Sequence, residues 1–106
     1  VVVHCAESVV LEKHASVAEL VTIADSTHYW TGPDDFFYDN VRTAPIHIGA
    51  NTWLCPRASV TSGVTVGSHC LIASSSVVIC DVPDGHLASG VPATTMRSLR
   101  HPWIDA

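Results

Sequence analysis

A strict six-residue period of apolar residues constrains the fold of this chain more than any other feature of its sequence. The downstream positions are Ile48, Leu54, Val60, Val66, Ile72 and Val78, and the upstream positions are Cys5, Leu11, Val17 and Ile23. An α-helix requires apolar residues three and four apart, and an amphipathic strand alternates every second residue. Neither explains a period of six, whereas a triangular coil with three six-residue faces does.

Each face of such a coil is a short strand that stacks in parallel on the next coil. One aliphatic side chain per face is expected to point into a narrow prism, and ten inward positions predict about three coils. Small or β-branched residues precede these positions by two and are expected at tight corners: Ile46, Thr52, Ala58, Val64, Cys70 and Ser76. The sequence therefore predicts an all-β parallel β-helix of hexapeptide repeats, as a single domain over residues 1–106.

Two segments depart from the period. Residues from about 24 to 45 contain the turn signals of Thr31–Asp35 and the aromatic run Phe36–Tyr38, and they are predicted to form a loop inserted into the solenoid. Insertions of this kind commonly carry the binding groups of repeat proteins. After Val78 the repeat is expected to end at the turn signal Asp81–Gly85. A C-terminal tail, about 84–106, is predicted to cap the open end.

Composition limits the possible partners. A net charge of −5, from ten acidic and five basic residues, argues against nucleic acid and anionic lipid, which require a basic face. A hydrophobic content of 47% with 14% charged residues is high for a small soluble monomer and predicts buried surface between subunits. No apolar run reaches the roughly 20 residues that span a bilayer, and no export signal is visible. A soluble, cytoplasmic protein without membrane association is expected.

The spacing of the four cysteines and the first residues of the sequence give two further indications. Cys5, Cys55, Cys70 and Cys80 form no C-x-x-C pair, so neither a zinc site nor a redox motif is indicated, and they are expected to be small core or wall residues in a reducing compartment. A start at Val1, without methionine and inside a strand pattern, indicates either a fragment or a processed chain.

Several segments together resemble the hexapeptide acyltransferases. They are Ile46–Leu54, Ser62–Gly67, Ile72–Val78, Asp81–Pro83 and Ser89–Ala93. The resemblance extends over residues 3–99 and is closest to the galactoside and maltose O-acetyltransferases and to polysaccharide-modifying acetyltransferases. It implies a left-handed parallel β-helix and a homotrimer. It also implies transfer of acetyl from acetyl-coenzyme A to a sugar or similar small hydroxyl acceptor, without a metal ion.

The segment Val21–His28 is similar to the family segment that ends in a histidine where the inserted loop begins. The resemblance therefore implies that His28 is the catalytic base, and an imidazole with a pKa near neutrality suits that task. Asp25 is assigned to the acceptor site, where it could fix the tautomer of His28; a role in a surface turn fits it equally well. A loop histidine without a task is the alternative for His28.

The resemblance also implies a set of coenzyme A contacts. Trp53 matches a tryptophan that packs along the pantetheine arm, and Ser74 and Ile79 fall on the wall whose backbone grips the same arm. Arg97 matches a basic residue near the nucleotide phosphates, where a guanidinium forms charge-assisted bonds. An outward aromatic buried between subunits is the alternative for Trp53, and a solvated surface cation is the alternative for Arg97.

Departures from the family pattern affect the same site. Cys80 occupies a coenzyme A position that usually holds lysine, and Thr94 replaces a second basic residue, so weak coenzyme A affinity is expected. Turn glycines are replaced by Cys55, Ala73 and Ser75, which corners accept if no positive φ is required.

Two other functions are alternatives on a β-helix of this kind. A γ-class carbonic anhydrase holds zinc with histidines, two of them five residues apart, and none of the seven histidines here has that spacing, which disfavours it. The other rival is a noncatalytic trimeric β-helix that serves as a scaffold or binding module, favoured by Cys80, Thr94 and the short N-terminus. Amine acceptors stay open as an alternative to hydroxyl acceptors.

Overall fold

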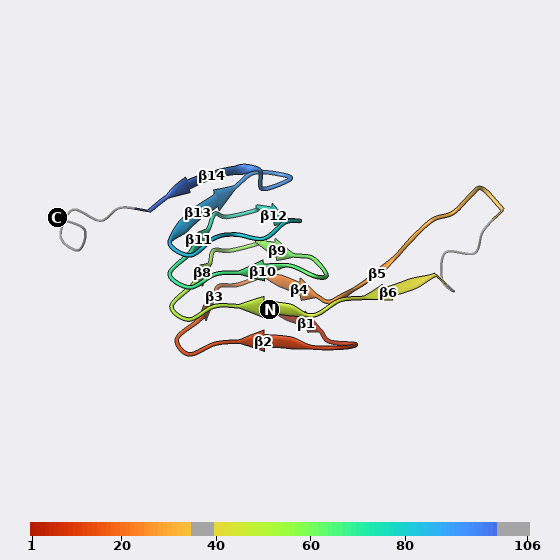
Figure 1. The fold of residues 1–106 in the computed structure, drawn as a ribbon, viewed down its shortest axis with the longest axis horizontal. Helices are drawn as coiled ribbons and strands as arrows, with labels where there is room; N and C mark the ends of the chain where they lie inside the picture. The colour runs from red at the N-terminus through yellow and green to blue at the C-terminus, as the bar shows by residue number, and fades with distance from the viewer. Residues whose placement is uncertain (35–39, 100–106) are drawn as a thin grey trace.

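The computed structural model describes residues 1–34 and 40–99, and these residues form strands and connecting turns (Figure 1). The strands are β1 (Val2–His4), β2 (Val9–Leu11), β3 (Ser16–Val17), β4 (Thr22–Ala24), β5 (Ser26–His28), β6 (Val41–Thr43), β7 (Ile46–Ile48), β8 (Trp53–Leu54), β9 (Ser59–Val60), β10 (Thr65–Val66), β11 (Leu71–Ile72), β12 (Val77–Val78), β13 (His86–Ser89) and β14 (Thr95–Ser98).

Three parallel sheets form the sides of a prism. Face A contains β1, β4, β9 and β12, face B contains β2, β7 and β10, and face C contains β3, β8, β11 and β13, with β14 antiparallel beside β13. The chain visits faces A, B and C in turn, so strands pair with their counterparts one coil away (Figure 1). The predicted all-β parallel β-helix is confirmed, and faces A and C each carry four coil layers rather than about three.

Regular coils contain three hexapeptides. His47 pairs with Thr65, Trp53 with Leu71 and Ser59 with Val77, so each partner lies eighteen residues further along the chain. Backbone N–H groups of one coil donate to carbonyl oxygens of the next, as Gly49 does to Val66 at 2.8 Å. Each strand is short, and each coil is stabilised mainly by stacking on its neighbours.

The core contains both apolar columns. Ile48, Leu54, Val60, Val66, Ile72 and Val78 are 0–2% exposed, as the period predicts. The column two residues earlier, Ile46, Thr52, Ala58, Val64, Cys70 and Ser76, is also buried rather than at the corners. Residues two apart in a strand point to the same side. Each face therefore contributes two inward side chains, and the prediction of one was wrong.

The register of the upstream period is correct at three of its four positions, because Leu11, Val17 and Ile23 pair with Ile48, Leu54 and Val60. Ile23 is fully buried and Val17 is half-buried, but Leu11 is 43% exposed and is not a core residue. The prediction for Cys5 was wrong: Val3 pairs with Ile23, and Cys5 is exposed. The cause is an expanded turn between β1 and β2, because Val2 pairs with Thr22, twenty residues away instead of eighteen.

Corners of the prism use left-handed backbone conformations. The non-glycine residues with positive φ are His14, Leu20, Asn51, Arg57, His69 and Ser75, and Gly63 continues their six-residue spacing. Cys55 and Ala73 meet the condition that no positive φ is required, but Ser75 does not meet it, because its φ is 60°. A side chain in this conformation costs about 1–2 kcal/mol.

The β-helix continues beyond the point where the repeat was expected to end. Val82 bridges to Val66, and β13 pairs in parallel with β11, so Asp81–Gly85 lies within a further coil. β14 then turns back along β13, and Met96 packs against the core. Residues 100–106 of the predicted tail lie outside the described residues.

Candidate active site

A two-stranded hairpin leaves the prism at the edge between faces A and B. β5 and β6 pair antiparallel, with His28 opposite Val41, and they connect β4 on face A to β7 on face B. Figure 1 shows the hairpin projecting away from the stacked coils. It occupies the place of the predicted insertion; the aromatic run Phe36–Tyr38 lies outside the described residues.

His28 is the last residue of β5, and it is exposed. The strand pairing continues past it, because the Tyr29 N–H donates to the Asn40 carbonyl at 3.0 Å. The Arg42 guanidinium lies 4.3 Å above the centre of the Tyr29 ring, a cation–π contact that links the two strands. The imidazole of His28 is therefore presented on a paired strand.

Asp25 occupies the root of the hairpin and is fully buried. Its Oδ1 accepts the N–H of Ala6, and its Oδ2 accepts the N–H groups of Glu7 and Ser8, each at 2.7 Å. The amide of Ala6, followed by those of Glu7 and Ser8, holds the carboxyl pKa below its ordinary value of 3.8 although burial opposes this. These contacts give Asp25 a structural role, and a buried carboxylate so occupied does not provide the acceptor contact that was expected.

Face C presents a row of outward side chains that ends in a cation. The register aligns Trp53 with Leu71, Leu71 with Leu87, and Leu87 with Arg97. Trp53 is 52% exposed and Arg97 is exposed. Three strand spacings separate the ends of the row, about 14 Å. An apolar row with a guanidinium at one end suits a ligand that has an aliphatic arm and a phosphate.

The remaining sequence-predicted residues lie elsewhere on the prism. Ser74 is exposed at the corner from face C to face A, between β11 and β12. Ile79 and Cys80 follow β12 at the edge between faces A and B and are exposed. In a triangular prism that edge is opposite face C. One chain therefore places the root of the hairpin that carries His28 on the same edge as Ile79 and Cys80, and this edge is remote from Trp53 and Arg97.

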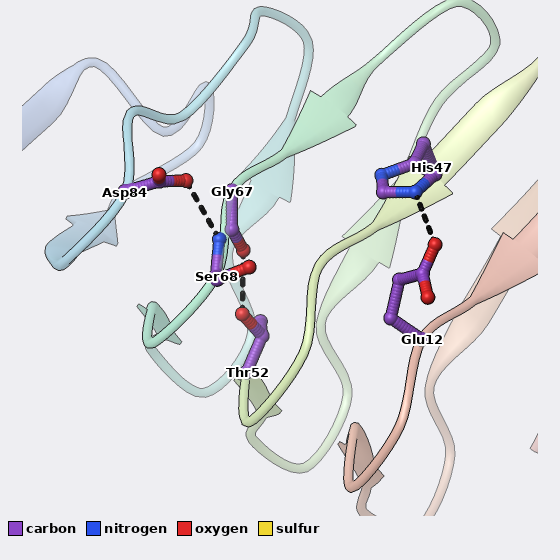
Figure 2. A network of polar contacts seen from close by, with 6 residues as sticks. All are labelled: Glu12, His47, Thr52, Gly67, Ser68 and Asp84. Carbon is purple, nitrogen blue, oxygen red and sulfur yellow. Dashed lines mark hydrogen bonds and ion pairs between the residues drawn. The ribbon is translucent and has the colours of Figure 1, made fainter.

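Sequence reasoning missed a carboxylate–imidazole pair. His47 Nε2 lies 2.8 Å from Glu12 Oε1, with both side chains about half exposed (43% and 48%) (Figure 2). The residues are 35 positions apart, so no local motif shows them. The alignment of β2 with β7 across the insertion would have been the signal. A carboxylate that orients an imidazole is a common arrangement in acid–base sites.

Within residues 1–34 and 40–99, no helix is long and apolar enough to cross a membrane. In the same residues, no three His, Cys, Asp or Glu side chains gather as metal ligands. The four cysteines are all free, and burial raises the pKa of the Cys55 thiol.

Known proteins match the solenoid. Residues 45–80 match the family model for bacterial transferase hexapeptide (six repeats). A protein of Staphylococcus aureus (strain Mu50) named "putative acetyltransferase" is 39% identical over 72 residues, which are 65% of this chain and 36% of that protein. The chain thus spans about a third of the length of the curated relatives it matches.

Solved structures share the fold. A maltose O-acetyltransferase from Clostridium difficile 630 is 28% identical, with a TM-score of 0.64 over 81% of this chain and 44% of that chain. A hexapeptide-repeat acetyltransferase from Vibrio cholerae O1 biovar eltor, complexed with acetyl-coenzyme A, is 26% identical, with a TM-score of 0.71 over 89% and 55%. The chain is therefore a left-handed parallel β-helix of hexapeptide repeats, and its resemblance to the hexapeptide-repeat acyltransferases is confirmed.

Proposed function

We propose that this chain carries the active site of an acetyl-coenzyme A-dependent acetyltransferase whose acceptor is a hydroxyl group of a sugar or a similar small molecule. The observation that carries the proposal is the exposed His28 on a hairpin that projects from a rigid prism. The names of the relatives support acetyl transfer, and the Vibrio neighbour supports acetyl-coenzyme A as cosubstrate. The Clostridium neighbour, a maltose O-acetyltransferase, supports a sugar hydroxyl as acceptor.

The proposed reaction is direct transfer in a ternary complex. His28 accepts the proton of the acceptor hydroxyl while the hydroxyl oxygen attacks the thioester carbonyl carbon of acetyl-coenzyme A. A backbone N–H on the facing coil stabilises the oxyanion that forms. The carbon–sulfur bond then breaks, the acetyl group stays on the acceptor oxygen, and the imidazolium returns its proton to the leaving thiolate. No acyl-enzyme and no metal ion take part.

The row on face C is the proposed place of the coenzyme A arm. Trp53 packs along the pantetheine, Arg97 contacts a phosphate, and the backbone near Ser74 contacts the arm from the adjoining corner. The backbone near Ile79, at the edge opposite face C, contacts the arm from the neighbouring copy. Cys80 supplies no cation where a lysine is usual, and an exposed thiol forms no comparable bond to phosphate. Coenzyme A binding is therefore expected to be weak.

We propose a homotrimer, which the placement of these residues supports. His28 and the row on face C lie on opposite sides of one prism, so in the proposed site His28 of one copy meets the row of another, and three such copies would close a ring. The exposed Trp53 and Trp30, at 52% and 69% exposure, would then be covered. We further propose a cytoplasmic location, which the free thiols of the four cysteines support.

A complementation experiment tests the shared site. Mixed trimers are made from equal amounts of His28→Ala and Trp53→Ala protein by unfolding and refolding them together. About a quarter of the sites then combine an intact His28 with an intact Trp53, so activity at low acetyl-coenzyme A should rise far above that of either variant alone. Mixed trimers that are no more active than the two variants would contradict a shared site.

The activity itself is tested by thiol release from acetyl-coenzyme A against a panel of sugars, with amino sugars included for the amine alternative. His28→Ala should lower the rate about 10²-fold or more and leave coenzyme A binding unchanged, because only the base is lost. His4→Ala, at an exposed histidine of β1, is the matched control and should keep full activity. If the unmutated protein binds no coenzyme A, the noncatalytic scaffold replaces this proposal. If the unmutated protein binds coenzyme A but His28→Ala transfers acetyl at an unchanged rate, His47 becomes the candidate base.

A further inference from the structure

The root of the hairpin is held by one buried carboxylate. Asp25 lies between β4 and β5, with no exposed surface. Its carboxylate receives three N–H groups at 2.7 Å from the successive residues Ala6, Glu7 and Ser8. Three converging backbone amides form a concave site for an anion, and bonds to an ionised acceptor are stronger than neutral ones.

The main chain of Asp25 joins the same junction. Its N–H donates to the His4 carbonyl at 3.2 Å, and its carbonyl accepts the Ala44 N–H at 2.9 Å. One residue thus contacts the outgoing turn of the first coil and the returning strand of the hairpin. His28 follows three residues later on β5. The direction in which the hairpin leaves the prism therefore depends on this residue.

Two other aspartates at corners of the prism accept fewer backbone amides than Asp25 does. Asp81 accepts the Thr65 N–H at 2.9 Å, and Asp84 accepts the Ser68 N–H at 2.8 Å (Figure 2). Both are exposed, and each carboxylate receives one backbone amide. Asp25 receives three amides at the junction where the insertion interrupts the coil. A larger set of bonds is concentrated where the chain leaves the regular stack.

We propose that Asp25 is a positioning residue for His28, which fixes the exit direction of the hairpin by binding the backbone of the first coil. This inference rests on the proposed role of His28 as the base. It differs from a carboxylate that bonds the imidazole itself. A direct bond would alter the affinity of the imidazole for protons, whereas binding the backbone alters the place of the imidazole and leaves that affinity unchanged.

The decisive variant is Asp25→Asn, which keeps the side-chain volume but points an N–H₂ group at an amide donor. Backbone hydrogen exchange in β5 and β6 should become about tenfold faster or more, because the hairpin root opens more often. The value of kcat should fall about tenfold or more through lost alignment, with coenzyme A affinity unchanged. The pH at which the rate is half-maximal should stay the same as in the unmutated protein. Asp84→Asn, whose amide oxygen can still accept the single Ser68 N–H at a remote corner, removes a charge only and should change none of these quantities.

Each result decides the inference. A folded Asp25→Asn protein with unchanged hairpin exchange and unchanged kcat would overturn it, and so would a shifted half-maximal pH, which indicates a direct bond to the imidazole. Should Asp25→Asn fail to fold, Asp25→Ser, whose hydroxyl keeps one acceptor, is measured in the same way. If the unmutated protein transfers no acetyl group, the proposed function fails, but the exchange comparison still tests whether Asp25 holds the hairpin.

Discussion

Close contact between coils at two glycines gives the sharpest test of the stacking register. A Cβ built on Gly49 would lie 2.4 Å from the carbonyl carbon of Gly67, 2.5 Å from its oxygen and 2.5 Å from the Ser68 nitrogen. All three atoms belong to the backbone, so no side chain can move aside. Normal contact requires about 3.5 Å between carbons, so Gly49→Ala forces the two coils about 1 Å further apart than they are.

The cost of that separation follows from the bonds nearby. Gly49 N–H donates to the Val66 carbonyl at 2.8 Å, and the Thr52 hydroxyl donates to the Gly67 carbonyl at 2.6 Å (Figure 2). Losing both costs about 2 kcal/mol, and the overpacking adds about 1–3 kcal/mol. The total of about 3–5 kcal/mol is a large part of the 5–15 kcal/mol that stabilises a typical domain.

Thermal and urea unfolding followed by circular dichroism measure this loss. Gly49→Ala should lower Tm by about 10 °C or more. Gly32→Ala is the matched control, because a Cβ at Gly32 meets nothing within 4 Å and its φ is not in the left-handed region. The control should stay within about 0.5 kcal/mol of the unmutated protein. If the two variants melt together, Gly49 does not stack on Gly67 and the register is wrong.

Three further outcomes are expected. Leu20→Gly should raise Tm by a few degrees, since Leu20 is 61% exposed with a φ of 60° and relief of about 1–2 kcal/mol of strain exceeds the entropy cost of glycine; a lower Tm would argue against the left-handed corner. The stability that Asp25 provides requires its carboxylate, whose pKa is lower in the folded chain than the ordinary 3.8. The Tm difference between the unmutated protein and Asp25→Asn should therefore be constant from pH 7 to about pH 5 and shrink below about pH 4; a constant difference down to pH 2 would contradict the assignment. Light scattering should give about three times the chain mass of 11.3 kDa, and a mass near that of one chain would contradict the shared site.

The architecture could be predicted because one column of the solenoid is uniformly aliphatic. The column two residues earlier contains the polar residues Thr52 and Ser76, and a hydrophobicity criterion does not assign such residues to a core. Their burial follows from the narrow prism, in which the Thr52 hydroxyl bonds the Gly67 carbonyl and the Cys70 thiol lies 3.1 Å from the Pro83 carbonyl. Cys5 fits the six-residue spacing of the sequence, but the expanded turn between β1 and β2 shifts the register, so that Val3 and not Cys5 pairs with Ile23.

The site was less predictable, because its contacts join residues that are distant in sequence. The motif indicated His28, but nothing local shows that Asp25 holds Ala6 to Ser8, 17–19 residues away, or that Glu12 reaches His47 across 35 residues. These contacts exist only once the insertion is extruded and β2 lies beside β7.

The separation of the proposed site residues onto two sides of the prism could be predicted by counting residues along the repeat. Eighteen residues return a regular coil to the same face, so Trp53 and Leu71 must share face C, while Ile79 falls on the edge where the hairpin leaves. Residues that would contact one extended ligand are thus separated by the width of the prism. A rigid coil cannot bend to bring them together. The repeat that makes the fold predictable therefore also separates the residues of the proposed site within one chain, and this separation supports the proposal that the chemistry takes place between copies of the chain.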